Sequence, residues 1–378
     1  MTGPAWFEHF ESLCKMRFGK RMRLAALCLM VIAAMGIASG LLFIFGVNTG
    51  LRNLVLAMTF AAAPVPLYIA ITLWLDRFEA EPLWMVGVCF TWGATAAALI
   101  AMVVNHEAMV YLHQWQQTMN PRLLSVMLAA PAVEELAKGF ILLLLFMWNH
   151  DEFDGVLDGI IYAAMAGLGF AMTENVVYYA QALHQHGIWG LTNTALLRGL
   201  IFPFQHPFFT SFLGIGLGWA AVSQYPSVRR WAPPAGLLLS ISLHVLWNVS
   251  TIHRHFFIAG YLLVSAPVML GVISLIVISL RGEAKVIARN LLGDVELKHL
   301  TAREHKRLSS IHRRFLFDVR SLLTKGPRAC WASICFHQAA TELAFFRHHV
   351  STGRLAEDAA KEVGYQARLT ALRPRLIQ

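Results

Sequence analysis

Two adjacent carboxylates and an ammonium group lie in the middle of an apolar stretch of this sequence. Residues 131–139 read PAVEELAKG, preceded by LLSVMLAA and followed by FILLLLFMW. A charged side chain at membrane depth is costly, so charges that are retained there usually serve a function. Glu134 and Lys138 are four residues apart and therefore share one face of a helix. We therefore take Glu134, Glu135 and Lys138 as candidates for a site inside a membrane.

Three further apolar stretches carry polar groups that are rare inside membranes. Histidine occurs in two of them, at His206 and His244. If each stretch is a helix, the main polar groups lie roughly 5 to 16 Å from the same membrane surface, because neighbouring helices run in alternating directions. The polar candidates in these stretches are Glu174, Asn175, Arg198, His206, His244 and Asn248. Their similar depth predicts that they form one constellation.

Two glutamates, two histidines and an asparagine in a dry site can hydrolyse an amide in two ways. In the first, a carboxylate takes a proton from water, a histidine holds the reacting group or donates a proton to it, and Asn248 donates a hydrogen bond to the developing oxyanion. In the second, Glu134, His206 and His244 bind a zinc ion that lowers the pKa of its bound water. We favour the first and expect no cofactor, with zinc as the alternative, because asparagine suits an oxyanion better than a zinc ion. No serine or cysteine is placed as a nucleophile with a helix-spaced base.

Each of these residues taken alone also has a purely structural interpretation. Glu135 and Lys138 can form a buried ion pair that holds helices in register. A single histidine can donate its hydrogen bond to a backbone carbonyl, and Asn248 can form a hydrogen bond with a neighbouring helix. Glu174 can orient another side chain. The occurrence of all of them at one depth favours a catalytic site.

The composition indicates that these residues belong to a membrane protein. Of the 378 residues, 57% are hydrophobic and 14% are charged, and the mean hydropathy of +0.55 is too high for a soluble domain of this size. We expect an all-α, polytopic membrane protein, with Pro64 and Pro66 kinking the second span. Its eight apolar stretches, each about long enough to cross a bilayer, are 24–46, 53–75, 83–104, 123–148, 156–180, 196–221, 234–251 and 257–280.

Charge divides the chain and predicts its orientation. Lysine and arginine gather before the first span and at the same side of later spans, which places both termini in the cytoplasm. We expect a cytoplasmic N-terminus (1–23), a transmembrane domain (24–280) and a basic, helical, cytoplasmic tail (281–378). The tail holds 18 Lys and Arg against 9 Asp and Glu, which equals the whole chain's excess of +9. Because no nucleic-acid-binding motif accompanies this charge, we expect anionic lipid headgroups beside the tail and no nucleic acid.

An ordered set of motifs resembles the PrsW family of bacterial intramembrane proteases. The motifs are EExxK from Glu134, DGxxY with GLGFAxxENVxYY at 158–179, R, H and GxGLG at 198–218, and HVLWN at 244–248. The DRFEAEP loop at 76–82 fits the family as well. The elements F-x-x-x-H and H-x-x-x-N also match the wider clan of CAAX-processing and bacteriocin-processing membrane proteases. The resemblance covers about residues 60–250 in order, the core of the transmembrane protease domain that it implies.

The resemblance implies a role for each matched residue. Glu134 is the water-activating carboxylate with Glu135 as its neighbour, His206 and His244 position the water, Asn248 stabilises the oxyanion, and Lys138, Glu174, Asn175 and Arg198 support them. The sequence departs from the family pattern at Pro207, where the family usually has a small residue. Proline is expected to kink the sixth span beside His206.

The prediction is therefore an intramembrane peptidase that cuts membrane-anchored proteins at the outer side of the bacterial plasma (inner) membrane. Its partners are a membrane-anchored protein substrate and the lipid bilayer. The resemblance suggests anti-sigma factors as substrates, cut at a first site to start a signalling cascade. The alternative is a non-enzymatic membrane receptor or transporter that uses a buried Glu/His relay. Transporters usually show inverted repeats, and the sequence shows none.

Overall fold

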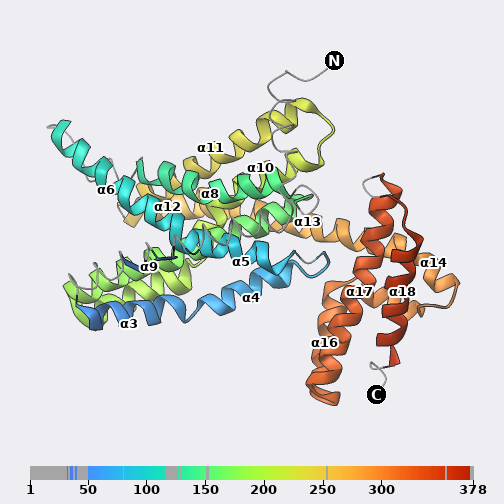
Figure 1. Ribbon diagram of the computed structural model, residues 1–378. Helices are drawn as coiled ribbons and strands as arrows, with labels where there is room; N and C mark the ends of the chain where they lie inside the picture. Colours follow the sequence, from blue (N-terminus) through green and yellow to red (C-terminus); the bar gives the residue numbers. More distant parts are fainter. Residues whose placement is uncertain are drawn as a thin grey trace. The chain divides into compact units, whose positions relative to one another are not determined.

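The computed structural model describes residues 50–79, 81–115, 129–149, 153–252, 254–353 and 356–374, with a few single residues before 50 and at 127. The described residues form helices and no strand, which confirms the all-α prediction (Figure 1). They divide into two compact units. The first comprises the described residues of Met1–Thr72 and Glu81–Gly271, and the second those of Leu73–Ala80 and Val272–Gln378.

The first unit is a bundle of helices around α9 (Val156–Thr194). Alanine and glycine are frequent in the buried part of α9, between Leu157 and Ala180, and they let α3, α5 and α10 pack closely against it. The other helices are α3 (Leu51–Ala62), α4 (Val65–Leu75), α5 (Leu83–Trp92), α6 (Ala98–Trp115), α8 (Ala130–Trp148), α10 (Gln205–Val222), α11 (Pro226–Ser250), α12 (Arg254–Gly260) and the start of α13 (Ala266–Asn290). The π-helical segments η1 (Gly93–Ala97), η3 (Ala195–Ile201) and η4 (Tyr261–Ser265) interrupt the long stretches.

Five helical stretches of the described residues are long and apolar enough to cross a membrane. They are Leu51–Leu75, Leu83–Tyr111, Val156–Val222, Pro226–Ser250 and His255–Asn290. Val156–Val222 covers two predicted spans, 156–180 and 196–221. Helix α8 has the length of a span but carries Glu134, Glu135 and Lys138, and it is not among the five. The predicted first span, 24–46, lies outside the described residues apart from a few single ones, so the number eight remains a prediction.

Proline and glycine determine where two of these stretches bend. Helix α3 ends at Ala62 and α4 begins at Val65, so the predicted break in the second span falls at Pro64. Helix α9 kinks at Gly187, whose φ of +63° is left-handed backbone that glycine adopts without strain.

The prediction of a kink at Pro207 is wrong. Helix α10 begins at Gln205, so Pro207 lies in its first turn, where a missing N–H removes no hydrogen bond from the helix. The break in this stretch falls earlier, at residues 202–204, directly after η3. His206 is therefore held at the start of a regular helix.

Helices α9 and α10 approach one another closely at glycine positions. A Cβ atom on Gly167 would lie 2.5 Å from the backbone nitrogen of Pro207, and one on Gly159 would lie 2.1 Å from the carbonyl oxygen of Gly214. Contacts this short force the backbone to move, because packed interiors have no spare volume. The glycines of α9 thus fix the position of α10, including His206.

We expect Gly167→Ala to destabilise the protein by about 1–3 kcal/mol, because the added methyl group pushes the start of α10 away from α9. Thermal unfolding of the purified protein in detergent measures the effect. Gly87→Ala is the matched control, since a Cβ atom on Gly87 in α5 meets no atom within 4 Å. Equal unfolding temperatures of the two variants would contradict the close packing of α9 on α10.

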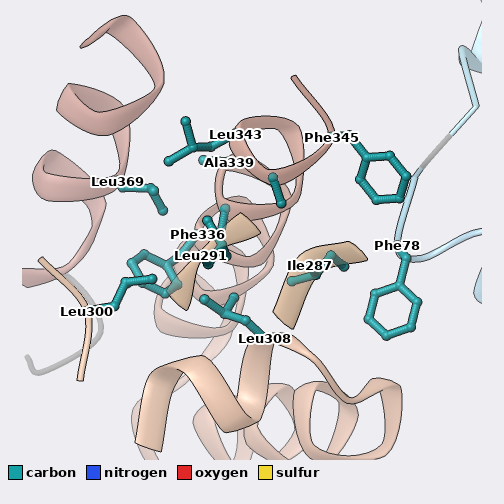
Figure 2. Packing of buried hydrophobic residues seen from close by; sticks show 12 residues of the cluster. Phe78, Ile287, Leu291, Leu300, Leu308, Phe336, Ala339, Leu343, Phe345 and Leu369 are labelled. Atoms are coloured by element: carbon teal, nitrogen blue, oxygen red, sulfur yellow. The ribbon is translucent and has the colours of Figure 1, made fainter. Parts of the chain in front are cut away.

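The second unit joins the C-terminal tail to a short segment from between two spans. Its helices are the rest of α13, α14 (Leu292–Glu296), α15 (Ala302–Leu308), α16 (Ile311–Lys325), α17 (Pro327–Ser351) and α18 (Ala359–Leu372). The apolar core gathers around α17, with Phe336 and Leu343 fully enclosed (Figure 2). Phe78, from the DRFEAEP loop, belongs to this core together with Ile287 and Phe345. The loop between α4 and α5 is therefore part of the fold of the tail.

Capping residues set the starts of the short helices in this unit. Thr301 and Glu304 form a capping box at α15, in which each side chain bonds to the other's backbone N–H. Ser310 and Asp358 accept backbone N–H groups at the starts of α16 and α18.

A buried polar cluster joins the DRFEAEP loop to α16 and α17. Asp318 accepts a hydrogen bond from Nη2 of Arg77 at 2.5 Å and another from the hydroxyl of Ser333. Nδ1 of His337 lies 3.3 Å from Oδ1 of Asp318. Burial, together with the nearby arginine charges, lowers the pKa of His337 to about 4.

We expect the packing of α17 to weaken as the pH falls from about 6.5 towards 4. An unfolded histidine binds a proton near pH 6.5, whereas folded His337 binds one only at about pH 4. The unfolded state therefore holds more protons in this range, so stability present above pH 6.5 is lost as the pH falls, by about 3 kcal/mol at most. Hydrogen exchange of α17, corrected for the intrinsic pH dependence, measures this loss. His337→Gln should flatten it, and an unchanged slope in that variant would assign it to other groups.

Candidate active site

The first unit contains a cavity of about 970 Å³ that the predicted site residues line. Its walls come from α6, α8, α9, η3, α10, α11 and α12. Of the predicted residues, the lining includes Glu134, Glu174, Asn175, Arg198, His206, His244 and Asn248. Glu135 and Lys138 are fully buried in α8 and are not part of this lining. The predicted constellation is therefore assembled in one place.

Glu135 is enclosed by donors on both of its carboxylate oxygens. Oε1 accepts from Nζ of Lys138 and lies 2.9 Å from Nδ1 of His244. Oε2 accepts from the hydroxyls of Thr210 and Ser240, at 2.8 Å each. Because these partners come from α8, α10 and α11, Glu135 ties three helices together.

Lys138 and Glu174 hold His206 from its two sides. Nζ of Lys138 lies 3.1 Å from Nδ1 of His206, and Oε2 of Glu174 lies 2.9 Å from Nε2. An ammonium group only donates, so Nδ1 accepts and Nε2 carries the ring proton, which it donates to Glu174. The Lys138 ammonium also lies 4.5 Å from the ring centre of Phe170. Both nitrogens of His206 are thus occupied by protein groups.

Arg198 reaches the cavity from the π-helical segment η3. Its Nε donates to Oδ1 of Asn175 at 2.8 Å, and its Nη2 donates to Oε2 of Glu174. The guanidinium carbon lies 4.0 Å from the ring centre of Tyr178. Single turns of π-helix often occur at functional sites, because they turn one side chain out of the regular helical register. Asn175 and Tyr178 here fix the direction of Arg198.

Glu134 and His244 face one another at the wall of the cavity. Oε2 of Glu134 is buried without a hydrogen-bond partner among the described residues, and it lies 3.8 Å from Nε2 of His244. Since Nδ1 of His244 donates to Glu135, its Nε2 is the accepting nitrogen. The ring of His244 is stacked on Phe209, with centres 4.7 Å apart, which fixes its plane. Two acceptors at this separation can both receive hydrogen bonds from one water molecule.

Three residues that contact the carboxylates, Asn105, Thr210 and Ser240, are not among those predicted from the sequence. Thr210 follows His206 by four residues and Ser240 precedes His244 by four, so helical spacing alone identifies both. Nδ2 of Asn105 lies 3.5 Å from Oε1 of Glu134. Asn105 comes one residue after the predicted end of the third span. A search extended by one helical turn beyond each span finds it.

Glu134, His206 and His244 are the residues that could bind a zinc ion at this site. Glu134, His206 and His244 each offer one ligand atom, and these atoms lie within 4.8 Å of one another. Two histidines and a glutamate are a known ligand set of catalytic zinc sites. The hydrogen bonds of His206 do not fit, because both nitrogens are engaged and the proton faces Glu174. As arranged, the three residues do not fit a zinc ion that all of them bind.

Comparison with known proteins identifies a family and several relatives of this chain. A family model described as PrsW family intramembrane metalloprotease matches residues 81–277, which contain every candidate site residue. Relatives that carry the name Protease PrsW match part of the chain. The one from Geobacillus kaustophilus is 31% identical over 173 residues (46% of this chain, 69% of the relative), and the one from Oceanobacillus iheyensis is 27% identical over 168 residues (44% and 70%). The Bacillus subtilis protein is 28% identical over 156 residues (41% and 65%).

No solved structure matches this chain. The family match covers 197 of the 378 residues, more than half of the chain. Within it lie the residues that surround the cavity and four of the five stretches that can cross a membrane in whole or in part. The chain therefore belongs to the PrsW family of intramembrane proteases.

Proposed function

We propose that this chain hydrolyses a peptide bond of a membrane-anchored protein with a water molecule that Glu134 activates. The observation that carries the proposal is the pair of facing acceptors, Oε2 of Glu134 and Nε2 of His244, 3.8 Å apart. A water molecule that donates to both has its oxygen lone pairs directed away from them, towards the cavity. A carbonyl carbon of a bound substrate is then open to attack.

The reaction needs one proton transfer to Glu134 and one proton transfer from it. As the water oxygen bonds to the carbonyl carbon of the substrate, one water proton moves to the carboxylate of Glu134. The tetrahedral intermediate then collapses, the carbon–nitrogen bond breaks, and Glu134 returns the proton to the leaving nitrogen. His244 acts as a positioning residue, because its Nε2 accepts a hydrogen bond from the second O–H group of the water molecule. Glu135 supports it by keeping the His244 proton on Nδ1.

Two asparagines have complementary parts in this proposal. Asn248 lines the cavity on α11, one helical turn after His244, and we assign it to the developing oxyanion. Asn105 donates to Oε1 of Glu134 and so directs Oε2 towards the water. His206, Glu174 and Arg198 form a hydrogen-bonded chain that holds the opposite wall of the cavity.

The proposal is a reaction without a metal ion. The family description names a metalloprotease, but the arrangement of His206 between Lys138 and Glu174 leaves it no free lone pair. A zinc ion held by Glu134 and both histidines would have to displace one of these two partners. We therefore assign water activation to the carboxylate of Glu134.

The setting of the reaction follows from charge and resemblance. The distribution of lysine and arginine supports cytoplasmic termini, and the depth of the polar residues supports a site in the outer half of the bacterial plasma membrane. The motifs support a membrane-anchored substrate. An anti-sigma factor is the substrate that the resemblance suggests.

Co-reconstitution tests the proposed function. The full chain is placed in lipid vesicles together with single-span membrane proteins, and new termini are identified by mass spectrometry. We expect cleavage within or next to the span of some of these proteins. Absence of any cleavage, combined with a proton or solute flux that depends on Glu134, would instead support a transporter.

A further inference from the structure

Helix α16 turns polar residues inward and apolar residues outward. Arg314, Asp318 and Ser321 are its buried residues. Arg314 donates from Nε to the carbonyl oxygen of Leu308 and from Nη2 to Oγ1 of Thr341, at 2.8 Å each. The inner face of α16 is thus held by hydrogen bonds and ion pairs.

The outer face of α16 carries an apolar stripe. Phe315, Leu316, Leu322 and Leu323 are 42, 52, 46 and 79% exposed. The pairs Phe315 with Leu322 and Leu316 with Leu323 are seven residues apart, so the four side chains form one strip along the helix. We call these four residues the α16 stripe. Large apolar patches on a folded surface mark contacts with a membrane or a partner.

Basic side chains surround the α16 stripe. Between residues 311 and 335 the exposed charged residues are Arg313, Arg320, Lys325 and Arg328, and the single acidic residue, Asp318, is buried. Trp331, 68% exposed, lies one helical turn after Arg328 at the start of α17. A cavity of about 720 Å³ at the corner between α16 and α17 is lined by Lys325, Arg328 and Trp331 among others. Basic and aromatic groups beside apolar ones are typical of surfaces that contact lipid headgroups.

The stripe is continuous with the end of an apolar span. The ring of Phe315 packs edge-to-face on Trp74, with centres 6.5 Å apart. Trp74 is the penultimate residue of α4, which ends Leu51–Leu75, one of the five stretches long and apolar enough to cross a membrane. Tryptophan is enriched where spans leave the hydrocarbon region. The α16 stripe therefore begins beside the end of a stretch that is long and apolar enough to cross a membrane.

We propose that the α16 stripe, together with Trp331, docks into the headgroup region of an anionic phospholipid leaflet. The four leucine and phenylalanine side chains would enter the boundary of the acyl chains, and the flanking arginine and lysine side chains would contact lipid phosphates. This surface lies outside residues 81–277, the region that the family model matches. It anchors the second unit, and with it the DRFEAEP loop, to the membrane surface.

Hydroxyl-radical footprinting of the unmodified full chain tests the proposal. The protein is reconstituted in nanodiscs of phosphatidylcholine alone or with about 30% phosphatidylglycerol, and side-chain oxidation is measured by mass spectrometry. Oxidation of Leu323 and Trp331 should fall about fivefold in the anionic discs, the factor expected for one added cation–headgroup attraction. Val363 is the internal control, because it is 60% exposed on α18, and α17 lies between α16 and α18 (Figure 1).

A charge-reversed variant separates lipid charge from other causes. Arg320→Glu with Arg328→Glu changes two exposed residues, and it should restore oxidation of Leu323 in the anionic discs. Oxidation that is equal in both lipids, and as high as that of Val363, would overturn the proposal. Protection that is equal in both lipids and lost on dilution would assign the stripe to a second copy of the chain. Protection that requires an added substrate protein would assign it to that protein, and both outcomes would also overturn the proposal.

Discussion

Glu134→Gln should reduce peptide-bond cleavage by about 10²–10⁴-fold, the contribution that a positioned general base commonly makes. An amide has the shape of the carboxylate but cannot accept a proton from water. Asn105 can keep its hydrogen bond to the Oε1 position, so the variant should fold as the unmodified chain does. The initial rate of cleavage of a co-reconstituted single-span protein measures the effect.

Glu107→Gln is the matched control for this substitution. Glu107 is an exposed carboxylate of α6, two residues after Asn105, and it does not line the cavity. Its amide variant should cleave at the unmodified rate. Full activity of Glu134→Gln, with unchanged thermal unfolding in both variants, would remove Glu134 from the reaction.

Glu135→Gln should destabilise the folded protein by about 3–5 kcal/mol, the usual cost of removing one partner of a buried ion pair. Lys138 is completely buried and loses its only carboxylate contact at hydrogen-bond distance among the described residues. The amide also replaces one carboxylate oxygen with an NH2 group. An NH2 group at the Oε2 position cannot accept the hydrogen bonds that the hydroxyls of Thr210 and Ser240 donate. Unfolding of the purified protein in detergent, followed by its far-ultraviolet circular dichroism, measures the loss.

The double variant Glu135→Gln, Lys138→Met tests the cause of that loss. Removing the ammonium removes the uncompensated charge, so the double variant should be more stable than Glu135→Gln alone. Its rate of cleavage should remain below that of the unmodified chain, because Nδ1 of His206 loses its donor and the ring is free to change tautomer. Two independent losses that simply add would show that Glu135 and Lys138 are not coupled.

The sequence was sufficient to identify the charged and histidine members of the candidate site, but not Asn105, Thr210 and Ser240, and the roles came from the resemblance and not from the spacing. Charged and polar residues at one membrane depth predicted that Glu134, His206 and His244 lie together, because such groups are costly in a bilayer unless they meet one another or water. Spacing could not distinguish Glu134 from Glu135, since adjacent residues on a helix point in directions that depend on the neighbouring helices. The hydroxyls of Thr210 and Ser240 make the distinction by enclosing Glu135.

The parts of the fold that escaped prediction depend on contacts between distant segments. Phe78 lies more than 200 residues before its partners in the tail, and nothing in its local pattern indicates them. Pro207 was expected to bend a helix because its spacing from the helix start was unknown, and the break before residue 205 makes it a favourable first-turn residue. Gly167 is one of many small residues in α9, and only the close approach of α10 shows why a side chain does not fit there.

The metal content of active protein tests the central claim most directly. The full chain is purified in detergent, dialysed against a strong chelator and reconstituted with a cleavable single-span protein, while bound metal is measured by mass spectrometry. If Glu134 activates water by itself, cleavage continues at the rate before dialysis with well below one zinc ion per chain. Cleavage that stops on chelation and returns with zinc alone, at one ion per chain, would contradict this account, because the metal and not the carboxylate would then activate the water.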